Sequence, residues 1–76
     1  MNEKQLKRAI TEIRKRLVEC DNLIAKWEAH KREFPARAIM ADGNIATVQS
    51  VRDALRTELR ELLGERDARK LKQTSL

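Results

Sequence analysis

The stretch Leu6–Phe34, LKRAITEIRKRLVECDNLIAKWEAHKREF, determines the fold of this chain. Its apolar residues recur at alternating steps of four and three, and only Lys31 interrupts the series. This is the a/d pattern of a heptad repeat, which is typical of a helix packed lengthwise against another helix. The pattern predicts an apolar seam on this helix, made by Leu6, Ile10, Ile13, Leu17, Cys20, Ile24 and Trp27.

A second stretch downstream repeats the same spacing and supplies the partner helix. Its predicted seam consists of Ile45, Val48, Leu55, Leu59 and Leu62, with Arg52 as the polar member. Beyond Leu62 the corresponding positions hold Arg66 and Arg69, so we expect apolar packing to stop there. The sequence therefore predicts two long helices that share one seam.

Capping and helix-breaking residues set the expected bounds of the helices within a single domain, residues 1–76. Asn2 is a good N-cap for a helix over about 2–33, and Pro35 ends that helix because proline disfavours helical geometry at Phe34. We expect a turn containing a short helix over 34–43, with Asp42-Gly43-Asn44 as the strongest turn signal. The second helix is expected over about 44–72, followed by a frayed tail at 73–76.

A short connection makes sequential helices antiparallel neighbours, and the two seams fix their register. Setting Trp27 opposite Ile45 brings Leu17 to Leu55 and places Arg52 opposite the small Cys20. A tighter register, with Phe34 opposite Ile45, would instead set Ile10 and Ile13 against Arg69 and Arg66, and is disfavoured. The predicted fold is an all-α, antiparallel two-helix coiled-coil hairpin.

Apolar residues outside the seam exceed what one partner helix can cover. Leu23 and Val51 fall at g positions and Leu63 at an e position, while Ile39 and Met40 lie in the expected turn as a lid or a contact surface. We therefore predict association into a homodimeric four-helix bundle, with a different protein as the alternative source of the missing helices. The candidate interface residues are Val18, Leu23, Ile39, Met40, Val51 and Leu63.

Composition excludes several classes of site. One cysteine forms no internal disulfide, and one cysteine with one histidine makes no plausible zinc site. The acidic residues are scattered, with no convergent pair and no nucleophile–base arrangement, so we expect no enzyme, metal or cofactor. No apolar run approaches the ~20 residues that cross a bilayer, and no signal-peptide pattern opens the chain, so we expect a soluble, cytoplasmic protein.

The net charge of +5 is concentrated near the two ends of the chain. In an antiparallel hairpin these ends meet, which gives a cationic pole able to neutralise phosphates. No aromatic residues stand among these charges to stack on bases, so binding would read phosphate and shape. The candidate nucleic-acid contacts are Lys4, Lys7, Arg8, Arg14, Lys15, Arg16, Arg66, Arg69 and Lys70.

Two functions follow from these observations. The first is a non-enzymatic protein-interaction module, a self-associating hairpin that acts as an adaptor, co-chaperone or inhibitor of a larger protein. The second is a basic helical-hairpin dimer that binds RNA or DNA through phosphate contacts at the cationic pole. The sequence favours the first, because it explains the surplus of apolar residues.

Overall fold

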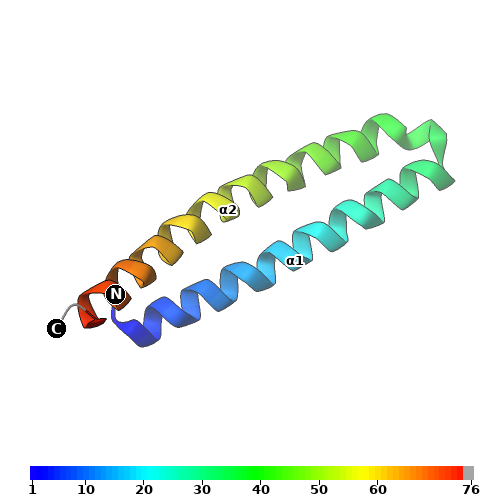
Figure 1. The fold of residues 1–76 in the computed structure, drawn as a ribbon. Coiled ribbons are helices and arrows are strands. Elements are labelled where there is room, and N and C mark those ends of the chain that lie inside the picture. Colours follow the sequence, from blue (N-terminus) through cyan, green and yellow to red (C-terminus); the bar gives the residue numbers. More distant parts are fainter. Residues whose placement is uncertain (75–76) are drawn as a thin grey trace.

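The computed structural model describes residues 1–74, with side chains described through Lys72. Two long helices form a hairpin: α1 spans Glu3–Glu33 and α2 spans Ala38–Thr74. A 3-10 turn, η1, spans Pro35–Arg37 and connects them. The hairpin extends 62 Å with a cross-section of 17 by 15 Å, and its two termini lie at the same end (Figure 1).

Local sequence signals define both ends of α1 as predicted. The side chain of Asn2 accepts a hydrogen bond from the Gln5 backbone N–H (2.8 Å), and the Gln5 side chain accepts one from the Asn2 N–H (2.9 Å). This reciprocal capping box satisfies two of the unpaired amides at the helix start. At the other end Pro35 begins the 3-10 turn, and the Phe34 N–H donates to the His30 carbonyl (2.8 Å).

The second helix begins at Ala38, so the prediction of a turn over 34–43 and a helix from 44 is wrong. Asp42-Gly43-Asn44 lies inside α2, and no described residue has a positive φ. Two physical reasons account for the difference. The 3-10 turn has already reversed the chain, and Ala41, which is fully buried, continues the seam spacing upstream of Ile45. A break at Gly43 would expose this packing and require a second helix nucleation.

Two further predictions, a lid formed by Ile39 and Met40 and a frayed tail over 73–76, also differ from the structure. Ile39 and Met40 form no lid, because both lie in the first turn of α2 and are 90 % and 50 % exposed. At the C-terminus the helix continues through Thr74, so Gln73 and Thr74 are helical where a frayed tail was expected. The remaining tail residues, Ser75 and Leu76, lie outside the described residues.

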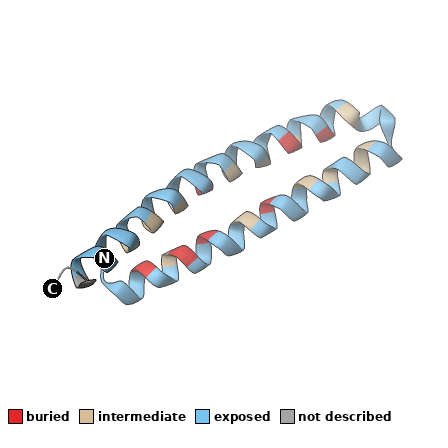
Figure 2. Ribbon diagram, viewed as in Figure 1, coloured by how far each residue is buried: buried red, intermediate tan, exposed pale blue. Residues whose placement is uncertain are grey.

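All predicted seam residues lie buried or partly buried, and the buried positions face the opposite helix (Figure 2). Leu6, Ile10, Ile13, Cys20, Ile45 and Leu55 are buried, and Leu17, Ile24, Trp27, Val48, Leu59 and Leu62 are half-buried. Ile13, Cys20 and Leu55 form the central cluster. The core is therefore one thin line of side chains between two helices.

Two ion pairs confirm the predicted register. Arg52 Nη1 lies 3.2 Å from Asp21 Oδ1, next to Cys20, as expected for Arg52 opposite Cys20. Lys31 Nζ lies 2.8 Å from Asp42 Oδ1 near the turn, and this pair fits the same register of the two helices as the Arg52–Asp21 pair. In the disfavoured register Arg52 would sit opposite Trp27, more than one helical turn from Asp21.

Candidate interaction surfaces

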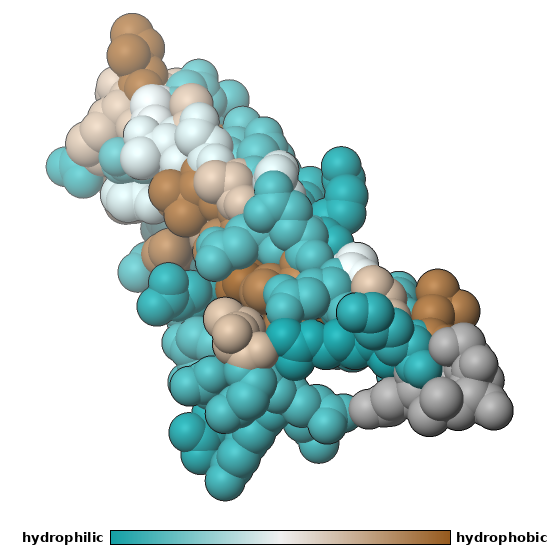
Figure 3. Space-filling view, turned by 90° about the vertical axis from the view of Figure 1, so that its left-hand side faces the viewer, coloured by the Kyte–Doolittle hydropathy of each residue, from teal (hydrophilic) through white to brown (hydrophobic). Residues whose placement is uncertain are grey.

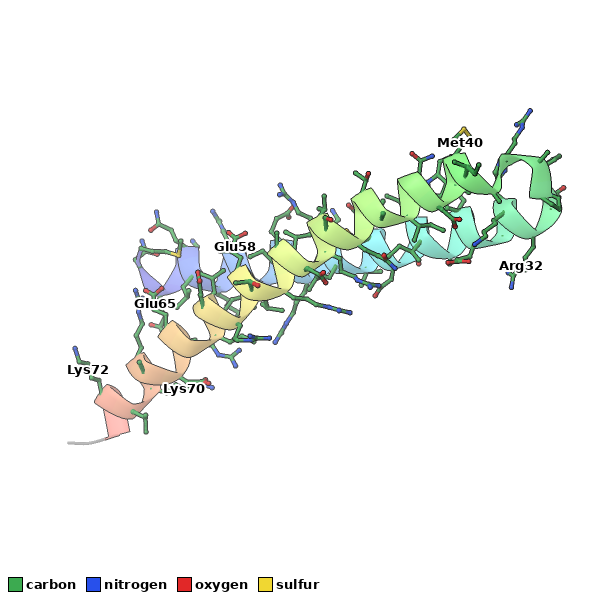
Figure 4. All side chains as sticks on the ribbon, turned by 90° about the horizontal axis from the view of Figure 1, so that it is seen from above. Arg32, Met40, Glu58, Glu65, Lys70 and Lys72 are labelled. Atoms are coloured by element: carbon green, nitrogen blue, oxygen red, sulfur yellow. The ribbon has the colours of Figure 1, made fainter. Side chains whose placement is uncertain are left out.

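The two helices present two different long sides to solvent. In an antiparallel pair the g positions of both helices share one side and the e positions share the other, because a two-fold axis normal to the hairpin relates the helices. Met40, Glu58 and Glu65 lie on one long side of α2 and Lys70 on the other (Figure 4). Two surfaces therefore gather part of the predicted interface and nucleic-acid residues, and the rest lie elsewhere.

The first surface, which we call the apolar flank, consists of Leu23, Trp27, His30 and Phe34 on α1 and Met40 and Val51 on α2. The α1 members are spaced at i, i+4, i+7 and i+11, which is one helix face. Trp27, His30 and Met40 line a common surface depression, which joins the two helices on this side. Leu23, Phe34, Met40 and Val51 are each 43–50 % exposed, although they are large and hydrophobic.

Aromatic rings contact one another edge-to-face and tilted at the turn end of the apolar flank. The Trp27 and His30 ring centroids are 5.4 Å apart with an interplanar angle of 86°, and His30 and Phe34 are 4.9 Å apart at 45°. The Arg37 guanidinium carbon lies 5.5 Å from the Phe34 ring centroid. These contacts gather aromatic side chains and an arginine at the surface, a composition that is common in protein interfaces.

The structure brings together only part of the predicted interface set. Leu23, Met40 and Val51 share the apolar flank. Leu63 lies on α2 among Arg56, Arg60 and Asp67, away from that flank. Val18 (60 % exposed) and Ile39 (90 %) fall at b positions on the outer faces of the two helices, which point away from the seam. Figure 3 shows hydrophobic side chains as several patches among hydrophilic ones on the face in view.

The second surface is a groove at the end of the hairpin where the termini lie. Seen from above, the two helices cross and the last turns of α2 lie away from α1 (Figure 4). A groove of about 410 Å³ opens there, lined by Leu6 and Ile10 and by the charged residues Glu3, Lys7, Arg14, Arg66, Arg69 and Lys70. It forms where the seam positions change from Leu62 to Arg66 and Arg69, so apolar packing no longer closes the helices together.

The charges around this cationic groove are only partly neutralised. Arg69 Nη2 donates to the Met1 carbonyl (2.5 Å) and contacts Glu65 Oε1 (2.6 Å), which ties the N-terminus to α2. Arg66 Nε lies 3.6 Å from Asp67 Oδ1. Within the described part of the chain, Lys7 and Arg14 have no ion pair. The groove therefore offers Lys7 and Arg14 of α1 to an anion, beside the paired arginines of α2.

The other predicted nucleic-acid contacts lie outside the groove. Lys4 and Arg8 are on the outer surface of α1, and Lys15 is exposed there as well. Arg16 lies on the side of the apolar flank and pairs with Glu12 at 3.6 Å. Only Lys7, Arg14, Arg66, Arg69 and Lys70 converge on one site.

Two features were missed by the sequence reasoning. Ala41 is a buried seam residue, and the signal for it was present, because Ala38 and Ala41 continue the 3-4 spacing upstream of Ile45. The convergence of Met40 with Trp27 does not follow from the sequence prediction, because that prediction places Met40 in a turn. Because α2 begins at Ala38, Met40 is helical and lies one turn before Asn44. Asn44 is a g position, so Met40 lies on the same side of α2 as the g positions.

Among the described residues there is no cluster of histidine, cysteine, aspartate and glutamate able to hold a metal ion, and neither helix has the length and apolarity to span a membrane. Comparison of the chain with protein-family models, with curated proteins and with solved structures finds no match. The functional argument therefore depends on the two surfaces described above.

Proposed function

We propose that this protein is a non-enzymatic interaction module, a helical hairpin that self-associates through its apolar flank into a homodimeric four-helix bundle. In this role it serves a larger protein as an adaptor, co-chaperone or inhibitor. The observation that carries the proposal is the row of half-exposed large apolar side chains, Leu23, Phe34, Met40 and Val51, along one side of the hairpin. Large apolar side chains gathered on one exposed side commonly mark an interaction site.

The surface area of the hairpin supports the same proposal. The isolated chain exposes 6044 Å², whereas a compact monomer of 8.8 kDa exposes roughly 4,800 Å². The excess is roughly 1,250 Å². A standard specific interface buries about 800 Å² on each partner. Pairing along one long side therefore removes about two thirds of this excess.

The thinness of the core gives a thermodynamic reason for association. The buried hydrophobic residues are Leu6, Ile10, Ile13, Cys20, Ala41, Ile45 and Leu55, of which two are small. Ordering each residue costs about 1.5 kcal/mol of conformational entropy, and a small single-layer core offsets this only marginally. Burial of the apolar flank against a second chain adds the missing stabilisation.

A charge placed on the apolar flank tests the proposal. Val51→Glu sets a carboxylate into the proposed interface, and desolvating it without a partner should raise the dimer dissociation constant at least about tenfold. The matched control is Val18→Glu, which introduces the same change at a 60 % exposed valine on the outer face of α1. Sedimentation velocity should show dissociation for V51E and unchanged association for V18E. Equal behaviour of the two variants would argue against the apolar flank as the interface.

A second function is supported by the cationic groove. Lys7 and Arg14 of α1, which have no ion pair with a described residue, line this groove beside Arg66 of α2, an arrangement suited to phosphate oxygens. We propose that the same bundle binds RNA or DNA there through sequence-independent phosphate contacts. Titration with duplex DNA and with structured RNA at two salt concentrations should show affinity that falls as salt rises. Absence of salt-sensitive binding at micromolar protein would remove this function and leave the first untouched.

A further inference from the structure

We infer that the partner on the apolar flank is a second copy of this chain oriented turn to turn, with Leu23 of each copy against Val51 of the other and Arg16 of each against Glu58 of the other. This inference rests on the proposed self-association and specifies its geometry. It makes the two hairpins parallel to each other, so that both turns lie at one end of the bundle and both cationic grooves at the other.

The register of the hairpin decides which residues share a level. The Arg52–Asp21 ion pair at 3.2 Å fixes α1 against α2 in the middle of the molecule. In that register, g positions of the two helices lie at the same height along the hairpin axis. Leu23 lies level with Val51, and Arg16 lies level with Glu58. The turn half of the flank therefore carries the large apolar side chains Leu23, Phe34, Met40 and Val51 beside the polar His30, whereas the half near the termini carries Arg16, Glu58 and Glu65.

A two-fold axis along the hairpin places α1 of one copy directly opposite α2 of the other at the same level. Each Leu23 then meets the Val51 of the second copy, and both side chains, 44 % and 50 % exposed in the single hairpin, become covered. Phe34 and Met40 stand opposite each other in the same way near the turn. The interface thus joins the large apolar side chains of the two copies in the turn half.

One pair of opposite charges also meets in the other half in this orientation. Arg16 of one copy faces Glu58 of the second, twice by symmetry. In the single hairpin Arg16 makes only a 3.6 Å contact with Glu12 between side chains that are about 60 % exposed, and such a pair is weak enough to exchange. Glu58 has no ion pair with any described residue. Full head-to-tail overlap would instead set Leu23 and Trp27 against the charged half, which disfavours it.

A charge-swap mixture tests the Arg16–Glu58 contact. The variant Arg16→Glu has two acidic residues at positions 16 and 58, and the variant Glu58→Arg has two basic ones. In either variant, like charges therefore face each other within the hairpin and between the two chains of its homodimer. When the two are mixed, only contacts between the chains become complementary, while the charges within each chain stay repulsive. The turn-to-turn dimer therefore predicts heterodimers above the statistical share in native mass spectrometry, and a statistical mixture would overturn this contact.

Distances between spin labels test the orientation without altering the interface. Lys4→Cys and Ile39→Cys, each in a Cys20→Ala background, place one label per chain at an exposed site near either end of the hairpin. Turn-to-turn pairing predicts that both label pairs lie within about twice the 17 Å width of the hairpin. The two sites are roughly 45 Å apart along the helices at 1.5 Å per residue, so any head-to-tail dimer separates at least one pair by about 45 Å or more.

The outcomes separate this inference from the proposed function. Two short distances support the turn-to-turn dimer, and one long distance overturns it while leaving self-association intact. A wild-type chain that sediments as a monomer overturns both. Circular dichroism of each labelled variant checks that the helices are retained before its distance is interpreted.

Discussion

At the scale of single residues, Lys31 shows how a polar side chain is tolerated in an apolar seam. It occupies the seam position between Trp27 and Phe34, and its Nζ hydrogen bonds to Asp42 Oδ1 at 2.8 Å. Its side chain is 39 % exposed, so the ammonium group keeps contact with water. The contact with Asp42 joins the last turn of α1 to the first turns of α2 and closes the seam with a charge pair.

This contact predicts a pH dependence at the alkaline end. The hydrogen bond to Asp42 raises the pKa of Lys31 above its ordinary value of 10.5. The folded state therefore holds this proton more tightly than the unfolded state does. The stabilisation is complete below pH 10.5 and is lost as the pH rises through the raised pKa.

Denaturant unfolding of the wild type and of Asp42→Asn, from about pH 9 to about pH 12, measures this contribution. The difference in unfolding free energy between the two proteins should shrink as the pH rises, because only the wild type loses the pair. The variant serves as the control for all other lysines, which titrate in both proteins. A difference that stays constant across the range would show that the pair contributes nothing to folding.

At the scale of elements, periodicity predicted the seam and the antiparallel register, and both ends of α1 followed from Asn2 and Pro35. The start of α2 did not follow, because the local preferences of Asp42, Gly43 and Asn44 oppose helix by only about 1 kcal/mol per residue at most. Burial of Ala41 and the contact of Asp42 with Lys31 outweigh them. These are tertiary contacts, and local turn preference carries no information about them.

The apolar flank shows the same limit of sequence reasoning. Spacing alone identified Leu23 and Val51 as surplus apolar residues, but it did not place Met40 beside Trp27, since that requires Met40 to be helical. Nor did it separate Val18 and Ile39 from the rest. Their outward positions follow only when the two helices are set side by side in the observed register.

Substitution of Gly43 tests whether α2 is continuous through this region. An added Cβ at Gly43 meets nothing within 4 Å, and its φ is not positive. Gly43→Ala should therefore stabilise the protein by about 0.5–1 kcal/mol, since alanine loses less backbone entropy in a helix. Gly64→Ala, at an equally open helical site, is the matched comparison, and thermal unfolding measures both. If Asp42-Gly43-Asn44 formed a turn, G43A would destabilise the protein instead.

At the scale of the whole molecule, the hairpin has one buried interface, the seam between its two helices, and two exposed surfaces. The seam joins α1 to α2, the apolar flank exposes Leu23, Met40 and Val51, and the cationic groove opens where the seam ends at Leu62. A turn-to-turn dimer would cover the flank and bring two cationic grooves to one end. Interaction and phosphate contact are therefore compatible on a single bundle, because they use opposite long sides.

Sedimentation equilibrium of the wild-type chain tests self-association most directly. At micromolar concentration we expect a mass of twice 8.8 kDa, with dissociation on dilution accompanied by loss of helical circular dichroism. The coupling is expected because the thin core of one hairpin is only marginally stable. A chain that stays at 8.8 kDa at all concentrations, with undiminished helical signal, would contradict the account.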